Sequence, residues 1–223
     1  METHAEENYL KAIYSLSEQS DNAVLTSVVA NHIQSKPSSV TDMIQRLSAK
    51  KLVDYKKYKG VSLTANGKQK ALHIIRKHRL WELFLVKYLN FAWDEVHDIA
   101  EQLEHVKSPL LVTKLDAFLN YPTRDPHGDI IPDEKGKLRD GHSPFLSELK
   151  QGQSCNIAAV KDSSQEFLNY LDNTGIGLGT VLEIQKVYPY DQSILVSIDN
   201  RNDMTLSEKV CKNLYVTLID KHD

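Results

Sequence analysis

The stretch PSSVTDMIQRLSAK, residues 37–50, predicts the architecture of the N-terminal third of the chain. It opens on a proline, whose missing N–H costs the first turn of a helix nothing. Apolar residues then recur at helical spacing, at Val40, Met43, Ile44 and Leu47. A shorter apolar pattern precedes it over residues 28–33, with Thr26 placed as its cap and a turn at residues 34–36. Two short helices joined by a tight turn are typical of a helix-turn-helix.

Residues 52–63, LVDYKKYKGVSL, predict two short strands around a basic turn, which is a β-wing. The alternative is a solvated hairpin whose lysines serve solubility. Beside a helix-turn-helix, these lysines are placed to contact phosphate, and the helix that begins at Pro37 to contact bases. The expected DNA-binding residues are Ser35, Lys36, Pro37, Ser38, Ser39, Thr41, Asp42, Gln45, Arg46, Lys56, Lys57 and Lys59.

Charge is unevenly distributed along the 223 residues, although the net charge is only −3. Residues 1–79 carry 13 Lys and Arg against 7 Asp and Glu, and the remainder carries 14 against 23, giving balances of +6 and −9. A basic head on an acidic body suits a polyanion-binding module. Cys155 and Cys211 are far apart and have no CxxC partner, so neither a disulfide framework nor a zinc knuckle is indicated. No apolar run approaches about 18 residues and no leader is evident, so we expect a cytoplasmic protein without a membrane partner.

Residues 94–105, DEVHDIAEQLEH, place four metal-binding side chains together if the whole stretch is a helix capped by Asp94. His97, Glu101, Glu104 and His105 then fall at i, i+4, i+7 and i+8 and share one face. Two imidazoles and two carboxylates on one face require a positive group between them, and a divalent cation is the economical one. The alternative is a solvated acidic face.

The helices around this stretch are strongly apolar. We expect a helix over residues 5–17 that ends before Asp21-Asn22, and a long helix capped by Thr64 that runs to Leu89. The long helix carries His78 and Glu82 at i, i+4, and another apolar helix covers residues 109–119. So much apolar helix exceeds what one small layer can bury, which predicts a homodimer interface.

Beyond a polar linker the pattern changes to strands, expected at residues 155–160, 181–187, 193–198 and 215–219, with a short helix at 164–171. The predicted fold is therefore mainly α with a small β part. Its expected domains are a winged helix-turn-helix (1–64), a helical dimerisation and metal-binding domain (65–138), a linker (139–153) and a C-terminal β domain (154–223).

Five stretches, in this order, resemble the diphtheria-toxin-repressor family of metal-dependent transcriptional regulators, including its manganese-transport-regulator branch. They are ENYLKAIY (7–14), PSSVT (37–41), KHRL (77–80), EQLEH (101–105) and DPHG (125–128). The match covers the first two thirds of the chain. It implies a C-terminal domain built as the small SH3-like, FeoA-like barrel of the longer members.

The resemblance also implies metal ligands. The primary site would use Glu101, Glu104 and His105 with Asn8, for which Glu7 or a water can substitute. A second site would use His78, Glu82 and His97, as in iron-type members. The streptococcal manganese regulators suggest Asp125, His127 and Asp162 beside Glu82, with Glu166 as another acid.

A carboxylate at residue 101, where iron-type members have cysteine, makes the ligand set harder and favours Mn²⁺, with Fe²⁺ as the alternative. The expected protein is thus a repressor that binds operator DNA as a homodimer when metal is plentiful, with up to two metal sites per chain. One competing hypothesis is a dinuclear metal hydrolase using the same imidazoles and carboxylates, although no nucleophile stands out and we expect no enzyme. The other is a winged-helix regulator that senses something other than metal.

Overall fold

The computed structural model describes residues 2–18, 23–93, 95–138, 143–162, 164–199 and 202–219. The chain forms two compact units. The first contains Met1–His78, Gln102–Ser108 and Pro132–Leu138, and the second contains Arg79–Glu101, Pro109–Ile131 and Arg139–Asp223. The predicted break at Asp21-Asn22 lies outside the described residues. No helix of the described part is long and apolar enough to cross a membrane.

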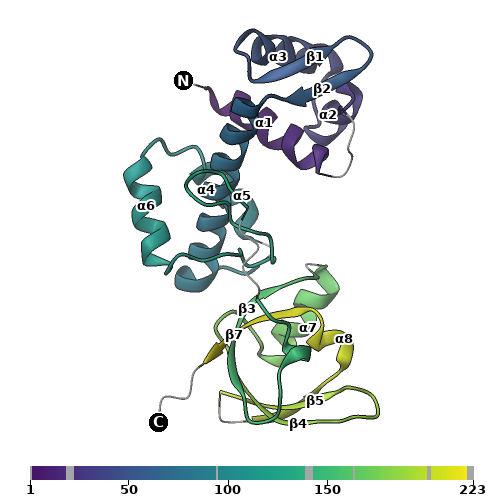
Figure 1. Cartoon of the computed structure of the whole chain (residues 1–223), viewed down its shortest axis with the longest axis vertical. Coiled ribbons are helices and arrows are strands. Elements are labelled where there is room, and N and C mark those ends of the chain that lie inside the picture. Colours follow the sequence, from purple (N-terminus) through teal and green to yellow (C-terminus); the bar gives the residue numbers. More distant parts are fainter. Residues whose placement is uncertain are drawn as a thin grey trace. The chain divides into compact units, whose positions relative to one another are not determined.

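The first unit is a winged helix-turn-helix, as the sequence predicts (Figure 1). It consists of α1 (His4–Ser17), α2 (Thr26–His32), α3 (Pro37–Ala49), the hairpin of β1 (Val53–Lys56) and β2 (Gly60–Leu63), and the first half of α4 (Ala65–Leu89). The strands pair antiparallel from Val53↔Leu63 to Lys56↔Gly60. The core is built from fully buried aliphatic side chains, including Leu10, Ile13, Ile44, Leu47 and Leu52.

Two helix starts in this unit test the predicted caps. Thr64 Oγ1 accepts a hydrogen bond from Gly67 N at 3.0 Å, which confirms Thr64 as the cap of α4. The prediction for Thr26 is wrong, because the N-cap of α2 is Leu25 and its side chain makes no cap hydrogen bond. The first turn is closed by the backbone instead, from Val29 N to Leu25 O at 3.1 Å. Gly67 is required at its position, since a Cβ there would lie 1.9 Å from Leu52 O.

The helical part of the second unit comprises the rest of α4, α5 (Val96–Leu103) and α6 (Pro109–Phe118). Its core contains Leu80, Leu83, Leu115, Leu119 and Ile131. The helix predicted over residues 94–105 is shorter than expected, and its proposed cap Asp94 lies outside the described residues.

The stretch with the predicted metal ligands His97, Glu101, Glu104 and His105 therefore does not present one continuous helical face. The backbone turns after Leu103, with Val106 N donating to Leu103 O at 3.1 Å. Glu104 and His105 fall in this turn and in the first unit, whereas His97 and Glu101 stay on α5 in the second.

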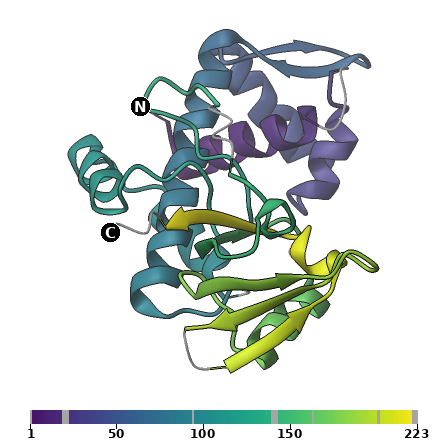
Figure 2. The same ribbon diagram turned by 60° about the horizontal axis from the view of Figure 1, so that its bottom comes forward.

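The C-terminal part of the second unit is a five-stranded antiparallel sheet with the order β6-β5-β4-β3-β7. Its strands are β3 (Ser154–Val160), β4 (Val181–Val187), β5 (Ile194–Ile198), β6 (Asn202–Leu206) and β7 (Leu214–Ile219). The sheet is open, so the expected closed barrel is wrong (Figure 2). Closure would require β6 to pair with β7, but the segment that joins them forms α8 (Glu208–Cys211) rather than a hairpin.

The core of the β domain lies between the sheet and α7 (Gln165–Thr174) and includes Leu171, Leu182 and Ile184. Leu146 and Leu149, from the stretch expected to be a linker, are also buried in it, around the short 3₁₀ helix Leu146–Glu148. This 3₁₀ helix, β6 and α8 were not predicted from the sequence. The alternation of β6 is weak because only one of its five residues is buried.

Candidate metal centres

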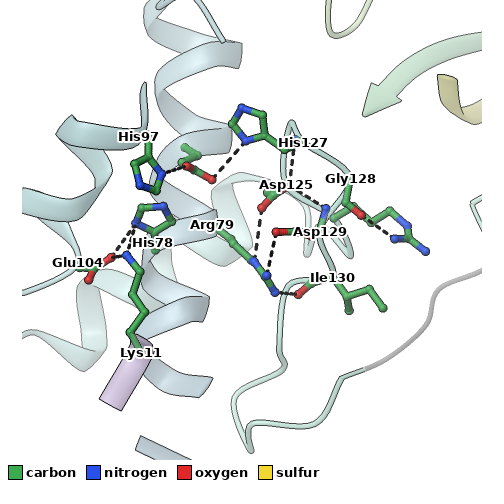
Figure 3. Close-up of polar contacts among 12 residues, drawn as sticks. Lys11, His78, Arg79, His97, Glu104, Asp125, His127, Gly128, Asp129 and Ile130 are labelled. Atoms are coloured by element: carbon green, nitrogen blue, oxygen red, sulfur yellow. Dashed lines mark hydrogen bonds and ion pairs between the residues drawn. The ribbon is translucent and has the colours of Figure 1, made fainter. Parts of the chain in front are cut away.

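Two clusters of carboxylate and imidazole side chains stand out, one in each unit; Figure 3 shows Lys11, His78 and Glu104 of the first and Asp125 and His127 of the second. The first, called here the Glu104 cluster, consists of Glu7, Lys11, His78, Glu104 and His105. Helix α1 supplies Glu7 and Lys11, α4 supplies His78, and the turn after α5 supplies the other two.

Glu104 is the centre of the first cluster and is fully buried. Its Oε2 lies 2.8 Å from Lys11 Nζ and 2.6 Å from His78 Nδ1. Burial opposes ionisation, but the hydrogen bond with His78 and the charge of Lys11 hold the pKa of Glu104 below its usual value. Glu104 is therefore a buried carboxylate that remains ionised.

The other oxygen of Glu104 tests whether a metal ion fits. Among the residues that the structure describes, Oε1 is buried without a hydrogen-bond partner. His105 Nε2 lies 4.0 Å from it. Two donors at this separation can straddle an ion whose bonds are about 2 Å long. A buried acceptor left unpaired is costly, so the Oε1 side of Glu104 fits a cation.

His105 is held by the N-terminal helix. Its Nδ1 lies 2.6 Å from Glu7 Oε2, and its ring stacks on His4 with centroids 4.3 Å apart. A carboxylate on one ring nitrogen fixes the orientation of the imidazole and leaves the other to bind an ion. Asn8, the expected ligand of α1, is exposed, and the structure gives the contact with His105 to its neighbour Glu7.

The second cluster, called here the Asp125 cluster, consists of Glu82, Asp125 and His127. Each offers a ligand atom, and the three atoms lie within 4.8 Å of one another. His127 Nδ1 is 3.7 Å from Glu82 Oε2, and its Nε2 is 3.1 Å from Trp93 O. His97 Nδ1 lies 3.3 Å from Glu82 Oε1. Carboxylates and imidazoles at this spacing suit a divalent cation.

Asp125 is buried and held by a tight turn. Its Oδ1 accepts hydrogen bonds from the backbone N–H groups of His127 and Asp129, each at 2.9 Å, and its Oδ2 lies 3.4 Å from Arg79 Nε. Burial, and then the charges of Glu82 and Asp129, raise the pKa of Asp125 to about 7. Burial disfavours the charged form of His127, but the hydrogen bond and charge of Glu82 overcome it and raise the pKa of His127 to about 9.

Arg79 fastens the whole loop that carries Asp125. Besides Asp125, its guanidinium reaches Asp129 Oδ2 at 3.0 Å and Ile130 O at 2.5 Å. Sequence reasoning missed both Arg79 and Lys11 as members of the clusters. A signal for Lys11 was available, since it lies four residues after Glu7 and so on the same face of α1.

The remaining predicted ligands are dispersed. Glu101 is half-buried on α5, with an oxygen 3.8 Å from His97 Nε2. Asp162 accepts a hydrogen bond from Ser164 N at 3.0 Å, and Glu166 is exposed in the first turn of α7. Within the described part of the chain, neither belongs to the Asp125 group. Their roles and that of Glu101 stay predictions.

The predicted DNA-binding residues lie on the surface of the first unit. Most of those on α3 and its N-terminal turn are exposed, while Ser35 and Thr41 are half-buried. Thr41 Oγ1 donates to Pro37 O at 2.9 Å within the helix. The wing lysines are exposed, and between them Tyr58, which the sequence did not single out, is 86% exposed with Lys57 Nζ 5.1 Å from its ring centre.

Family models match three consecutive parts of the chain. The N-terminal DNA-binding domain of iron-dependent repressors matches residues 1–61, and their metal-binding and dimerisation domain matches residues 64–133. A FeoA domain matches residues 145–218.

Curated relatives agree with this assignment. The iron-dependent repressor IdeR of Mycobacterium leprae is 33% identical over 141 residues, which cover 63% of this chain and 60% of that protein. The regulator MntR of Oceanobacillus iheyensis is 33% identical over 121 residues, which cover 54% of this chain and 81% of that protein. The chain thus spans little more than half the length of the IdeR proteins, 54% in Mycobacterium tuberculosis.

Solved structures are similar over nearly the whole chain. A manganese-dependent transcriptional repressor in complex with manganese has a TM-score of 0.61 and 34% identity, covering 96% of this chain and 99% of that one. ScaR with bound Zn²⁺ has a TM-score of 0.57 and 32% identity, with the same coverage.

The fold and the two clusters define a class, a winged helix-turn-helix protein equipped to bind divalent metal. The chain belongs to the iron-dependent-repressor family, whose members include the diphtheria toxin repressor and MntR. These are transcriptional repressors and not enzymes, as the sequence predicts, and the hydrolase hypothesis is discarded.

Proposed function

We propose that this chain is a transcriptional repressor that binds operator DNA as a homodimer when Mn²⁺ is bound, and so controls metal uptake. The observation that carries the proposal is the buried, ionised Glu104, whose Oε1 has no hydrogen-bond partner among the described residues and lies 4.0 Å from His105 Nε2. Relatives named as iron-dependent and manganese-dependent repressors support it.

The choice of manganese rests on the chemistry of the donors. Both clusters offer carboxylates and imidazoles, and the free thiols of Cys155 and Cys211 are buried in the C-terminal core. Hard oxygen ligands favour Mn²⁺, whereas thiolates favour softer ions. Fe²⁺ is the alternative, supported by the relatives named as iron-dependent.

In the Glu104 cluster, Glu104 and His105 would hold the ion, with Glu7 orienting His105 and Glu101 as a further predicted ligand. In the Asp125 cluster, Glu82, Asp125 and His127 would hold a second ion, with His97 beside Glu82. A bound divalent cation supplies the positive charge that both carboxylate groups require. The contact between Glu7 and His105 joins α1 to the turn after α5. Helix α1 in turn packs on the helix-turn-helix.

Exposed apolar side chains on α6 and at the end of α4 support the homodimer. Leu110 is 68% exposed and Phe118 is 57% exposed, with the ring of Tyr88 4.7 Å from that of Phe118. Large apolar side chains that are exposed together on a folded domain are typical of a surface that binds another protein chain. Pairing two winged helices in a dimer sets the spacing at which α3 meets successive major-groove half-sites.

The test is DNA binding with and without metal. A duplex selected from a random library in the presence of Mn²⁺ serves as the probe, and its affinity is measured by fluorescence anisotropy with Mn²⁺, with anaerobic Fe²⁺ and with a chelator. We expect tight binding with Mn²⁺ and loss of binding in chelator and in the variant Glu104→Ala with His105→Ala. The variant Lys186→Ala, in the β domain, should bind as the original protein does. Equal affinity in Mn²⁺ and in chelator would overturn the proposal.

A further inference from the structure

Lys11 contacts two other members of the Glu104 cluster, although its ammonium group cannot ligate a metal. Its Nζ is 2.8 Å from Glu104 Oε2 and 3.2 Å from His78 Nδ1, and its side chain is only 17% exposed (Figure 3). Since His78 Nδ1 is itself 2.6 Å from the same oxygen, two nitrogen groups converge on Oε2. An ammonium has three donors and no lone pair, so its role here is that of a fixed positive charge.

The two oxygens of Glu104 consequently differ. Oε2 is saturated by Lys11 and His78, whereas Oε1 is buried without a hydrogen-bond partner among the described residues and faces His105 Nε2 at 4.0 Å. A carboxylate free to rotate would expose either oxygen to an ion. Here the two contacts fix the carboxylate plane and direct one oxygen toward His105.

The positive charge of Lys11 has two opposite effects on a divalent ion. It repels the ion, but it also keeps a fully buried carboxylate ionised, and burial of an unpaired carboxylate is far more costly than a repulsion across intervening ligands. Lys11 contacts Oε2, and the oxygen without a hydrogen-bond partner among the described residues is Oε1, so the lysine and an ion can each use a different oxygen of Glu104. The stabilising effect therefore outweighs the repulsion.

We propose that Lys11 is a positioning residue of this centre, whose ammonium stays on Oε2 when metal binds, so that Oε1 is the oxygen that ligates the ion. This inference rests on the proposed function, because it takes Glu104 as a ligand. It excludes the opposite arrangement, in which the lysine is a placeholder that the ion expels.

The first experiment uses the unaltered protein. Lysine acetylation by an N-hydroxysuccinimide ester is followed residue by residue by mass spectrometry, with and without saturating Mn²⁺. Lys11 should be slow to react in both states. Lys70, which pairs with Glu2 at 2.8 Å and lies outside the cluster, serves as the reference. A several-fold rise in Lys11 reactivity on Mn²⁺ binding would mean that the lysine is displaced, and would overturn the inference.

The second experiment compares Lys11→Met, which removes the charge, with Lys11→Arg, which keeps it, and with the control Lys70→Met. Mn²⁺ affinity is measured by competition with a fluorescent chelator, and the melting temperature is measured without metal. We expect Lys11→Met to bind Mn²⁺ about tenfold more weakly, equivalent to about 1.4 kcal/mol, and Lys11→Arg to recover most of this loss. A merely structural lysine would lower the melting temperature and leave the affinity of the folded protein unchanged, which would overturn the inference.

Two further outcomes are distinguishable. If Lys11→Met does not fold, the labelling result on the unaltered protein decides alone. If the unaltered protein binds no Mn²⁺, Fe²⁺ or Zn²⁺, the proposed function itself fails, and this inference with it.

Discussion

The Glu104 and Asp125 clusters each contain a buried carboxylate, yet they compensate its charge differently. Glu104 has an ammonium and an imidazole within 2.8 Å, and its pKa is lowered. Asp125 has two backbone N–H groups and a guanidinium at 3.4 Å, but two more carboxylates crowd it and its pKa is raised to about 7. Burial opposes ionisation of both carboxylates; Lys11 and His78 overcome it at Glu104, whereas the neighbouring carboxylates reinforce it at Asp125.

The largest effect should come from removing the guanidinium that holds the Asp125 loop. Arg79→Met leaves the buried Asp125 without its cation and Ile130 O without its donor, and we expect a loss of about 3 kcal/mol in the free energy of unfolding. Urea denaturation in the presence of chelator measures it. Lys212→Met breaks an exposed Lys212–Glu208 pair and should cost less than about 0.5 kcal/mol. Equal losses in the two variants would contradict this role of Arg79.

A slightly smaller effect is expected at the other centre. Glu104→Gln keeps the shape of the side chain but removes the anionic oxygen that faces His105, and Mn²⁺ affinity should fall roughly 100-fold, about 2.7 kcal/mol. Isothermal titration resolves the loss of one binding event while binding at the Asp125 cluster persists. Undiminished affinity for both ions would remove Glu104 from the ligand set.

The pKa values predict that acid weakens the two centres unequally. His127, with a pKa of about 9, must lose its proton to ligate, and Asp125, with a pKa of about 7, loses one over the same range. Mn²⁺ binding at the Asp125 cluster should therefore tighten by up to about tenfold per pH unit between pH 7 and 9. Binding at the Glu104 cluster should change less, because Glu104 is already ionised. Titrations at pH 7, 8 and 9 on Glu104→Gln and on His127→Ala separate the centres, and parallel pH profiles would contradict the comparison.

In the absence of metal the sign for stability is the reverse. Both groups have folded-state pKa values above their ordinary ones, so the stability that they contribute is complete at low pH. That of Asp125 is lost as the pH rises through about 7, and that of His127 as it rises through about 9. Chelated protein should thus melt at a lower temperature at pH 9 than at pH 6.

The smallest effect distinguishes two neighbours on α1. Glu7→Gln weakens the 2.6 Å contact that orients His105, and we expect about fivefold weaker Mn²⁺ binding, roughly 1 kcal/mol. Asn8→Ala, at an exposed position, should change the affinity by less than about twofold. If Asn8→Ala proves the more damaging, Asn8 is a ligand as the family resemblance implies.

The sequence predicted the elements whose signals are local. The spacing of apolar residues and a proline predicted α3, and the basic turn predicted the wing. Thr64 predicted where α4 begins. It failed where distant contacts decide. The turn after Leu103 brings Glu104 to Lys11, 93 residues away, and to His78, 26 residues away, and no helical periodicity reveals such partners. The openness of the sheet depends likewise on which strands lie at its edges.

The residue types of the candidate site could be predicted from the sequence, but their spatial arrangement could not. The sequence singled out imidazoles and carboxylates, and the fold brings three of them, Glu82, Asp125 and His127, together; their role as metal ligands stays a prediction. Lys11 and Arg79 were not predicted, because the side chains expected around a bound cation are carboxylates and imidazoles rather than other cations. Lys11 lowers the pKa of Glu104, and Arg79 opposes the rise in the pKa of Asp125 that burial and the neighbouring carboxylates cause.

Cys155 and Cys211 have a practical consequence. Burial raises the pKa of each thiol to about 12, so almost no thiolate exists at neutral pH in the folded β domain. Oxidants and alkylating reagents should reach these sulfurs only when the sheet opens. The rate of thiol modification should therefore report how often this domain unfolds, without any added label.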